Sequence, residues 1–257
     1  MAIARFFHNV DLFITMTTNP EWPEIRQQLL PGQTSYDRPD LVARVFKLKL
    51  GEFLTDILKR GIFGRVSAHL YVVEFQKRGL PHIHLLLILH KEDGIRSPGD
   101  IDSCVAAHWP NPEEHPSLFQ TVKSCMIHGP CGNINPNTRC MKEGRCTKGY
   151  PKPYLETTTV TDDGYPSYAT PDDGRCFPVS VRRSTFAVDN RWIVPYNPYL
   201  SAKFNCHINV ESVASLRTIK YCFKYVHMVH LIISNLIFVI FVKQYVILHE
   251  SSLVDNS

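Results

Sequence analysis

The stretches Val66-Ser-Ala-His-Leu-Tyr-Val-Val-Glu-Phe-Gln76 and His82-Ile-His-Leu-Leu-Leu-Ile-Leu-His90 decide the fold. Both are rich in β-branched and apolar residues, and only Lys77-Arg-Gly-Leu-Pro81 separates them, which predicts two antiparallel strands joined by a turn. Leu12-Phe-Ile-Thr-Met-Thr-Thr18 has the same character and ends at Asn19-Pro20, which predicts another strand. We therefore expect an α+β fold with a central antiparallel sheet.

Helices are expected to flank this sheet. Asp37-Arg-Pro39 is a typical helix start, and residues 41–58 carry apolar side chains at helical spacing. Helical character returns at about 210–226. Residues 91–189 instead are rich in Pro, Gly, Cys and Asp and show little periodicity, which predicts an irregular Cys/His-rich insertion.

The charge distribution favours an anionic polymer as partner. The chain has 28 Lys and Arg against 24 Asp and Glu, and residues 38–78, 120–153 and 177–225 each have a net charge of +5. A solvated surface is the alternative explanation. None of the 13 glycines is followed by Lys, which excludes a phosphate-binding P-loop.

His82 and His84 form the sharpest candidate for a metal site. Side chains two residues apart on a strand point to the same face, so both imidazoles can reach one ion while Ile83 faces the core. Glu74 and Gln76 have matching parity across the turn, and either could add an oxygen ligand for a divalent metal with open positions. The alternative is two strand histidines that share no ligand.

Tyr221 and Tyr225 are candidates for a nucleophilic pair. They are four residues apart, so both hydroxyls lie on one face of a helix, with Lys220 and Lys224 beside them at the same spacing. A tyrosine with its ordinary pKa of about 10 is a poor nucleophile, and it needs a metal to polarise the phosphate it attacks. The alternative is an amphipathic helix with packing tyrosines.

The third candidate is a cluster of cysteines. Cys125-x2-His128-x2-Cys131-x8-Cys140-x5-Cys146 brings five soft ligands into 22 residues. Because the start of the chain lacks the pattern of a secretory signal, we expect reduced thiols or metal ligands rather than disulfides. We predict a structural zinc held by His128, Cys131, Cys140 and Cys146, with Cys125 in reserve; unliganded thiols are the alternative.

Basic and aromatic residues alternate between residues 177 and 199, a pattern that suits single-stranded nucleic acid. Stacking and phosphate neutralisation would come from Arg182, Arg183, Phe186, Arg191, Trp192, Tyr196 and Tyr199. The alternative is that Trp192 and the tyrosines belong to the core.

Several strings together resemble one family. The paired-His strand and the helical Tyr pair are similar to those of HUH endonucleases, and longer stretches resemble the replication-initiator region of Helitron transposases. These stretches are residues 11–24, 73–84, 126–132, 188–199 and 207–211. The resemblance covers about residues 2–226, in order.

The resemblance implies an HUH-like fold that nicks single-stranded DNA and transfers strands in rolling-circle transposition. His82 and His84, with Glu74 or Gln76, would bind Mg²⁺ or Mn²⁺. One of Tyr221 and Tyr225 would take the 5′ phosphate and free a 3′ hydroxyl, the other would accept a second strand, and Lys224 would assist. The first strand motif, represented by Thr15, Thr17 and Asn19, would help to place DNA.

The resemblance also implies an organisation and a cellular context. Residues 1–95 and 177–229 would form two parts of the nuclease core, 96–176 the insertion and 230–257 a divergent tail. Family members usually append a helicase, for which 257 residues leave no room. We expect a nuclear protein. The alternatives are an inactive DNA-binding remnant lacking its helicase and a zinc-supported interaction module.

After Tyr225 the sequence departs from the family. Residues 231–248 are largely apolar, near the lower length limit for a membrane-spanning helix, with Ser234, Asn235, Lys243 and Gln244 interrupting them. Three interpretations remain: a translated intron or frame-disrupted remnant, a buried strand or helix, and a membrane anchor.

Overall fold

The structure, a computed structural model, describes residues 10–76, 79–161, 165–181, 184–213 and 245–248. Contacts divide the chain into two compact units. The sheet unit comprises residues 1–96, 162–165 and 206–257, and the Cys/His unit comprises residues 97–161 and 166–205. Each unit is described by itself below.

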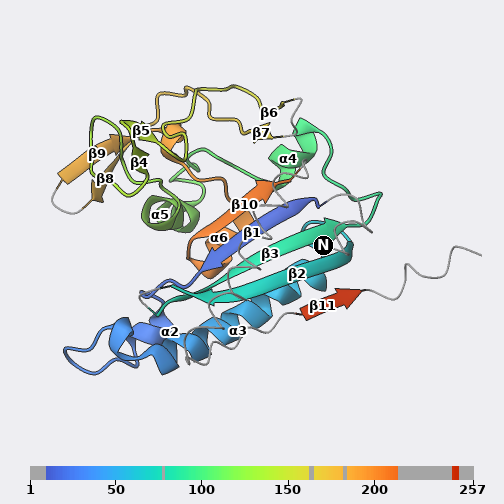
Figure 1. The fold of residues 1–257 in the computed structure, drawn as a ribbon, viewed down its shortest axis with the longest axis vertical. Helices are drawn as coiled ribbons and strands as arrows, with labels where there is room; N and C mark the ends of the chain where they lie inside the picture. Colours follow the sequence, from blue (N-terminus) through green and yellow to red (C-terminus); the bar gives the residue numbers. More distant parts are fainter. Residues whose placement is uncertain (1–9, 77–78, 162–164, 182–183, 214–244, 249–257) are drawn as a thin grey trace, which may run out of the picture. The chain divides into compact units, whose positions relative to one another are not determined.

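The sheet unit is built on a five-stranded antiparallel sheet in the order β10-β1-β3-β2-β11 (Figure 1). Its strands are β1 (Leu12–Thr17), β2 (Val66–Phe75), β3 (Pro81–Leu89), β10 (Ile208–Ser212) and β11 (Tyr245–Leu248). The pairing of β2 with β3 confirms the predicted hairpin. The α+β class with an antiparallel sheet is confirmed as well.

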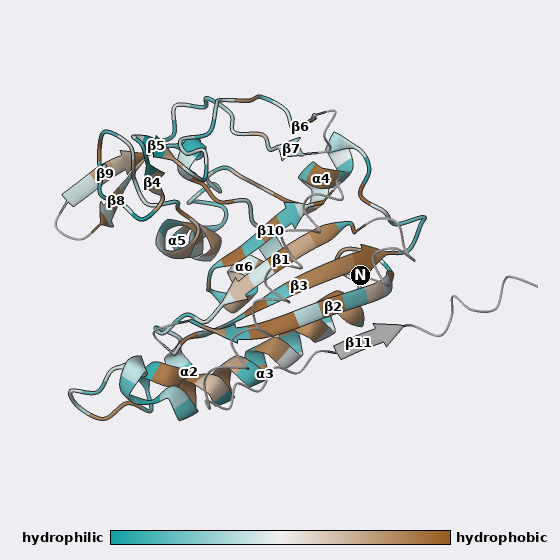
Figure 2. Ribbon diagram, viewed as in Figure 1, coloured by the Kyte–Doolittle hydropathy of each residue, from teal (hydrophilic) through white to brown (hydrophobic). Residues whose placement is uncertain are grey.

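One face of this sheet is buried and apolar at its centre. Ile14, Met16, Ile83 and Leu85 alternate with more polar neighbours, and none of the four is exposed. Such an apolar face must be shielded from water, and α3 (Pro39–Leu58) lies alongside the sheet (Figure 1). Figure 2 shows the apolar colouring of β3 and the mixed colouring of α3. The short α2 (Pro23–Arg26) and a 3₁₀ turn (Ser35–Asp37) precede α3.

The opposite face changes character along the strands. Near the β2–β3 turn it carries Thr15, His82 and His84, which are partly exposed. At the other end it is apolar, with a buried cluster of Val10, Phe13, Ala68, Leu86, Ile88 and Val213. The polar end of this face is therefore where a ligand can reach the sheet.

Two expectations for the C-terminal part are resolved only in part. Residues 208–212 form strand β10, so helix does not begin at residue 210; residues 214–226 lie outside the described residues. Residues 245–248 of the apolar tail form β11, which pairs with residues 68–71 of β2 at the sheet edge. None of the described helices is long and apolar enough to cross a membrane.

The Cys/His unit has more regular structure than its sequence predicts. Its helices are α4 (Pro98–Cys104), α5 (Pro116–Cys125) and α6 (Pro198–Phe204), with a 3₁₀ turn at Asn190–Trp192. Its strands form three two-stranded ribbons: β4 (Met141–Lys142) with β5 (Arg145–Cys146), β6 (Thr159–Val160) with β7 (Pro166–Ser167), and β8 (Phe177–Val181) with β9 (Ser184–Val188).

This unit has its own core. Trp109, Phe119, Val122, Trp192 and Tyr196 are buried together, and α5 packs against α6. Residues 177–205 supply much of this core, so they group with the Cys/His unit. The boundary expected after residue 176 therefore does not coincide with the observed division.

Two candidate metal centres

The β2–β3 hairpin places the first group of ligands. Glu74 lies directly opposite His82 in the register, and His84 follows on the same face. The turn closes because Gln76 donates its N–H to the Leu80 carbonyl (3.0 Å) and Gly79 adopts a φ of 80°, which favours glycine.

The ligand atoms of this group are close enough to share one ion. His82 Nε2 lies 2.9 Å from His84 Nε2 and 3.2 Å from Glu74 Oε2, and His84 Nε2 lies 3.8 Å from the same oxygen. Ligands that each lie about 2.1 Å from an ion are separated by roughly 3.0 Å at a right angle and roughly 3.4 Å at the tetrahedral angle. The group thus fits one side of a metal, with the remaining positions open.

Burial and mutual contacts keep residues of the first group in the protonation states that bind a cation. The side chains of His82, His84 and Glu74 are only 12%, 15% and 21% exposed. Burial, reinforced by the neighbouring His82 and opposed by Glu74, lowers the pKa of His84 to about 4. Hydrogen bonding from His82 lowers the pKa of Glu74. His84 is therefore neutral and Glu74 ionised at pH 7, which are the metal-binding forms.

The two histidines have different surroundings. His84 Nδ1 lies 3.0 Å from Thr15 Oγ1, and the Phe13 ring stacks on His84 at 5.6 Å between centroids with an interplanar angle of 8°. The Nδ1 atom of His82 is buried, and it has no hydrogen-bond partner among the described residues.

The other residues predicted near this group are placed differently. Gln76 is exposed at the end of the hairpin, beyond Glu74. Thr17 lies opposite His82 on β1. Asn19 accepts a hydrogen bond from the Glu21 N–H (2.9 Å) and begins the turn before α2.

The structure adds Asn209 of β10 to the residues near the first group. It lies opposite Thr15 and shares the face of the histidines. Its Nδ2 donates to Glu211 Oε1 (3.2 Å), whereas its Oδ1 is buried without a partner among the described residues. The polar alternation in Ile208-Asn-Val-Glu-Ser212 was the available signal.

The second group lies in the Cys/His unit. The ligand atoms of His128, Cys131, Cys140 and Cys146 all lie within 4.8 Å of one another, and Cys146 Sγ is 3.5 Å from His128 Nε2. Zinc ligands at the tetrahedral angle are separated by roughly 3.6 Å. The four residues thus fit a closed tetrahedral site. Cys125 is not in this group; its Sγ lies 3.3 Å from Ser124 Oγ at the end of α5.

A tight hairpin builds half of this second group. Glu143 and Gly144 both have positive φ, as in a type I′ turn, and they join β4 to β5. Cys140 precedes the hairpin and Cys146 ends it. The Lys148 N–H donates to Cys146 Sγ at 3.4 Å.

The surroundings of the second group keep its histidine neutral. His128 stacks on Tyr150, with 4.2 Å between ring centroids, and Lys152 lies over the Tyr150 ring. Burial and the charges of Lys152 and Lys148 lower the pKa of His128. Burial and hydrogen bonds with the other cysteines raise the pKa of Cys131 to about 12. The crowded Cys131 thiol therefore keeps its proton when no cation is nearby.

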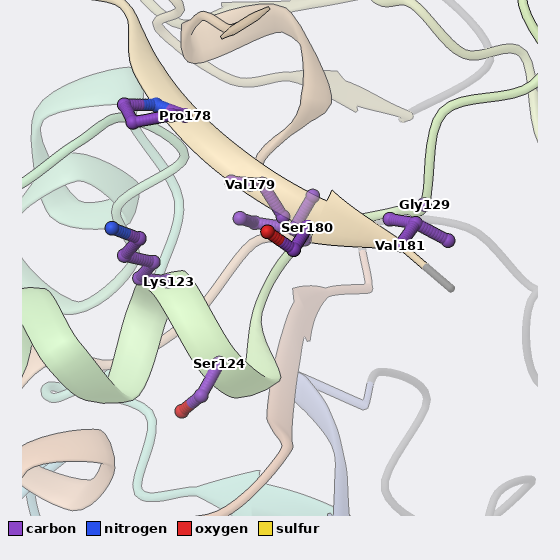
Figure 3. A pocket seen from close by; sticks show the side chains of 8 residues that line it. Lys123, Ser124, Gly129, Pro178, Val179, Ser180 and Val181 are labelled. Carbon is purple, nitrogen blue, oxygen red and sulfur yellow. The ribbon is translucent and has the colours of Figure 1, made fainter. Parts of the chain in front are cut away.

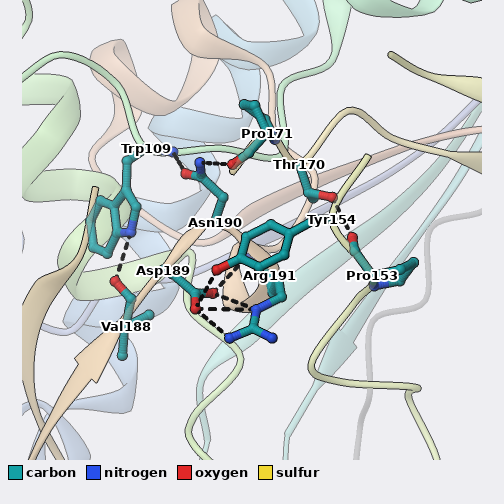
Figure 4. A network of polar contacts seen from close by, with 9 residues as sticks. All are labelled: Trp109, Pro153, Tyr154, Thr170, Pro171, Val188, Asp189, Asn190 and Arg191. Atoms are coloured by element: carbon teal, nitrogen blue, oxygen red, sulfur yellow. Dashed lines mark hydrogen bonds and ion pairs between the residues drawn. The ribbon is translucent and has the colours of Figure 1, made fainter. Parts of the chain in front are cut away.

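The predicted basic and aromatic interface is internal only in part: Trp192 and Tyr196 are buried, whereas Tyr199 is exposed. Arg191 lies in a network of polar contacts (Figure 4). The Arg191 guanidinium pairs with Asp189 (2.7 Å) and lies over the Tyr154 ring. Trp192 is 6% exposed and belongs to the core, so it is not presented for base stacking. Asn190, which the sequence did not single out, accepts from the Trp109 backbone N–H and donates to the Pro171 carbonyl, at 2.7 Å each.

Other predicted residues lie outside the described residues. These are Tyr221, Lys224 and Tyr225, as well as Arg182 and Arg183. A hollow of about 490 Å³ beside Val181 is lined by α5, β8, Ile127 and Gly129 (Figure 3). Among the described residues, Lys123 is the only charged one in its lining, and neither candidate metal group contributes to it.

The hairpin with its Glu-His-His group falls inside a recognised sequence region. Residues 1–87 match the family model of the Helitron helicase-like domain at the N-terminus. This part of the chain is a Helitron-like N-terminal region. The Helitron-like region includes β1, α3, β2 and most of β3, and with them all three ligands of the first group. No curated protein matches the chain.

Proposed function

We propose that this protein nicks single-stranded DNA and transfers the cut strand through a 5′-phosphotyrosine link, as in rolling-circle transposition of Helitrons. The observation that carries the proposal is the Glu74-His82-His84 group on the open face of a sheet that belongs to a Helitron-like region. The family match points to transposition, and the ligand set points to metal-assisted chemistry at a phosphate.

An HUH-like nuclease core is the finer fold that we infer. β3, the central strand in the order β10-β1-β3-β2-β11, carries both histidines, and α3 lies alongside the sheet. In this proposal residues 1–95 form the first part of the core, and the segment with Tyr221 and Tyr225 completes it.

The proposed cleavage is a displacement at phosphorus. The hydroxyl oxygen of Tyr221 or Tyr225 attacks the phosphorus, the bond to the 3′ oxygen of the preceding nucleotide breaks, and the tyrosine proton ends on that oxygen. The products are a 5′-phosphotyrosine and a free 3′ hydroxyl, and attack by another 3′ hydroxyl reverses the step on a new strand. The second tyrosine would hold a second strand end, and Lys224 would neutralise phosphate charge.

The residues of the first group would hold Mg²⁺ or Mn²⁺, which supplies Lewis-acid polarisation of the phosphate. Two imidazoles favour Mn²⁺ over Mg²⁺, which prefers oxygen ligands. Glu74 contributes negative charge, the imidazoles contribute lone pairs, and the partly buried site limits competition from water. The DNA strand would be guided by Thr17 and Asn19 and by the basic segments, which include Arg182 and Arg183.

We further infer that the second group holds structural Zn²⁺. Four ligands fill a tetrahedron, so no position is left for substrate. The metal would replace the thiol protons of three crowded cysteines and fix an irregular segment.

The proposed partners follow from the same region. The DNA strand is the substrate, and a helicase, which full-length relatives carry, would supply single strands. Action on chromosomal DNA would place the protein in the nucleus.

The test is an adduct assay with labelled single-stranded DNA and Mn²⁺ on a denaturing gel. We expect a covalent adduct that is lost in Tyr221→Phe/Tyr225→Phe and in His82→Ala/His84→Ala. Retention of the adduct in the double Phe variant would refute the assignment of the nucleophiles. A native-gel shift without any adduct would favour the inactive DNA-binding remnant.

A further inference from the structure

The two histidines of the first group differ in what holds the ring nitrogen that faces away from the ligand cluster. Thr15 Oγ1 lies 3.0 Å from His84 Nδ1, and Phe13 stacks on the same ring. Both residues come from β1, which runs antiparallel to β3 with Thr15 opposite His84. His84 is thus fixed by a hydrogen bond and by ring stacking, both from one neighbouring strand.

The corresponding nitrogen of His82 lacks such a partner. Its Nδ1 is buried and makes no hydrogen bond to any described residue, whereas its Nε2 faces Glu74 and His84. A neutral imidazole carries its proton on one nitrogen only. The contacts therefore favour the proton of His82 on Nε2, directed at the carboxylate, and the proton of His84 on Nδ1, directed at Thr15.

We propose that Thr15 is a positioning residue that presets His84 as the principal metal ligand, whereas His82 must shift its proton to Nδ1 before it can coordinate. This inference rests on the metal site of the proposed function. Ligating histidines usually donate their second N–H to a fixed acceptor, and loss of such a partner typically lowers metal affinity 10- to 100-fold. The Thr15 hydroxyl takes this role for His84, and its role in placing DNA is then secondary.

The test measures Mn²⁺ affinity of the full chain from the signal of free Mn²⁺ in electron paramagnetic resonance. Thr15→Val keeps the shape but removes the hydroxyl, and we expect its Kd for Mn²⁺ to rise about 10- to 100-fold. Thr15→Ser restores the hydroxyl and is expected to stay within about threefold of the unmodified chain. Thr17→Val, on the same strand opposite His82, is the matched control for metal affinity and is expected to leave the Kd unchanged.

A second measurement keeps the inference testable if Thr15→Val fails to fold. Nitrogen-15 NMR of the metal-free, unmodified chain should show His84 protonated at Nδ1 and His82 at Nε2. An unchanged Mn²⁺ Kd in folded Thr15→Val, or His84 protonated at Nε2, would overturn the inference.

The outcomes separate this inference from the proposed function. A chain that binds Mn²⁺ with the expected Thr15 dependence but forms no DNA adduct would refute nicking and leave the role of Thr15 intact. A chain that forms the adduct while its Thr15→Val variant binds Mn²⁺ normally would refute the role of Thr15 and leave nicking intact. A chain that binds no Mn²⁺ would refute both.

Discussion

The two candidate metal centres are built on opposite principles. Glu74, His82 and His84 project from a hairpin whose strands belong to a five-stranded sheet with a buried apolar centre. His128, Cys131, Cys140 and Cys146 come from turns and from ribbon strands of two residues each. The first group has a scaffold that does not depend on a metal, whereas the second is itself part of the scaffold.

This difference predicts which function each metal serves. A site on a stable sheet can leave coordination positions open for a substrate, because the fold does not depend on filling them. A site of four ligands in an irregular segment contributes its binding free energy to folding. Removing metal should therefore cost activity in one unit and structure in the other.

The largest effect is expected for a ligand of the second group. Cys146→Ser should abolish tight zinc binding and the cooperative unfolding of the Cys/His unit, because the metal substitutes for a larger core. Metal analysis should give about one zinc in the parent chain and none in the variant. Cys176→Ser is the matched control, since Cys176 is exposed and outside the group; a Cys146→Ser variant with full zinc content would contradict the assignment.

The next effect concerns the oxygen ligand of the first group. Glu74→Gln should raise the Mn²⁺ Kd about 10- to 100-fold while leaving thermal unfolding nearly unchanged, because a neutral amide is a poorer ligand. Gln76→Ala should stay close to the parent value, since Gln76 is exposed at the hairpin end. The reverse pattern in a titration calorimeter would make Gln76 the ligand.

The pH dependence of stability tests the buried environment of His84 in the first group. The pKa of His84 is lowered from 6.5 to about 4, so between these values the unfolded chain binds the proton first. Without divalent metal, this contribution to stability is complete above pH 6.5 and is lost as the pH falls toward 4, by on the order of 3 kcal/mol. Denaturant unfolding at several pH values should show this loss, and His84→Gln should flatten it; an equal slope in both chains would be evidence against it.

The smallest effect is expected at Arg191. Because Arg191 pairs with Asp189 and lies over Tyr154, its replacement by Ala should lower stability by about 1 kcal/mol or less. Single-stranded DNA affinity, measured by fluorescence anisotropy, should change less than in Arg182→Ala/Arg183→Ala. A large loss of affinity in Arg191→Ala alone would show that the ion pair opens to bind DNA.

Much of the sheet unit could be predicted because its signals are local. The alternation around Ile83 and the short turn before His82 give strand, pairing and a shared face without knowledge of the rest of the chain. The parity argument could not choose between Glu74 and Gln76, because only the place where the turn closes puts Glu74 opposite His82. The contact of Thr15 with His84, and the position of Asn209 on the same face, became visible only when distant strands were placed side by side.

In the Cys/His unit, the metal ligands could be predicted from the sequence, but the packing around them could not. The ligand spacing identified the four residues that the structure brings together, because soft ligands are rare enough to stand out. The burial of Trp192 and the internal pairing of Arg191 depend on packing against α5 and on Tyr154, which no local pattern encodes. Helices α5 and α6 were missed because they span only ten and seven residues, too few for a helical period to stand out.

The central claim is that the Glu74-His82-His84 group binds a divalent metal and directs formation of a phosphotyrosine link. Mass spectrometry of the chain after incubation with single-stranded DNA and Mn²⁺ tests it most directly. We expect a nucleotide adduct on Tyr221 or Tyr225 that forms only with metal and is absent in His84→Ala. An adduct that forms equally in His84→Ala, or none in a chain shown to bind Mn²⁺ and DNA, would contradict it.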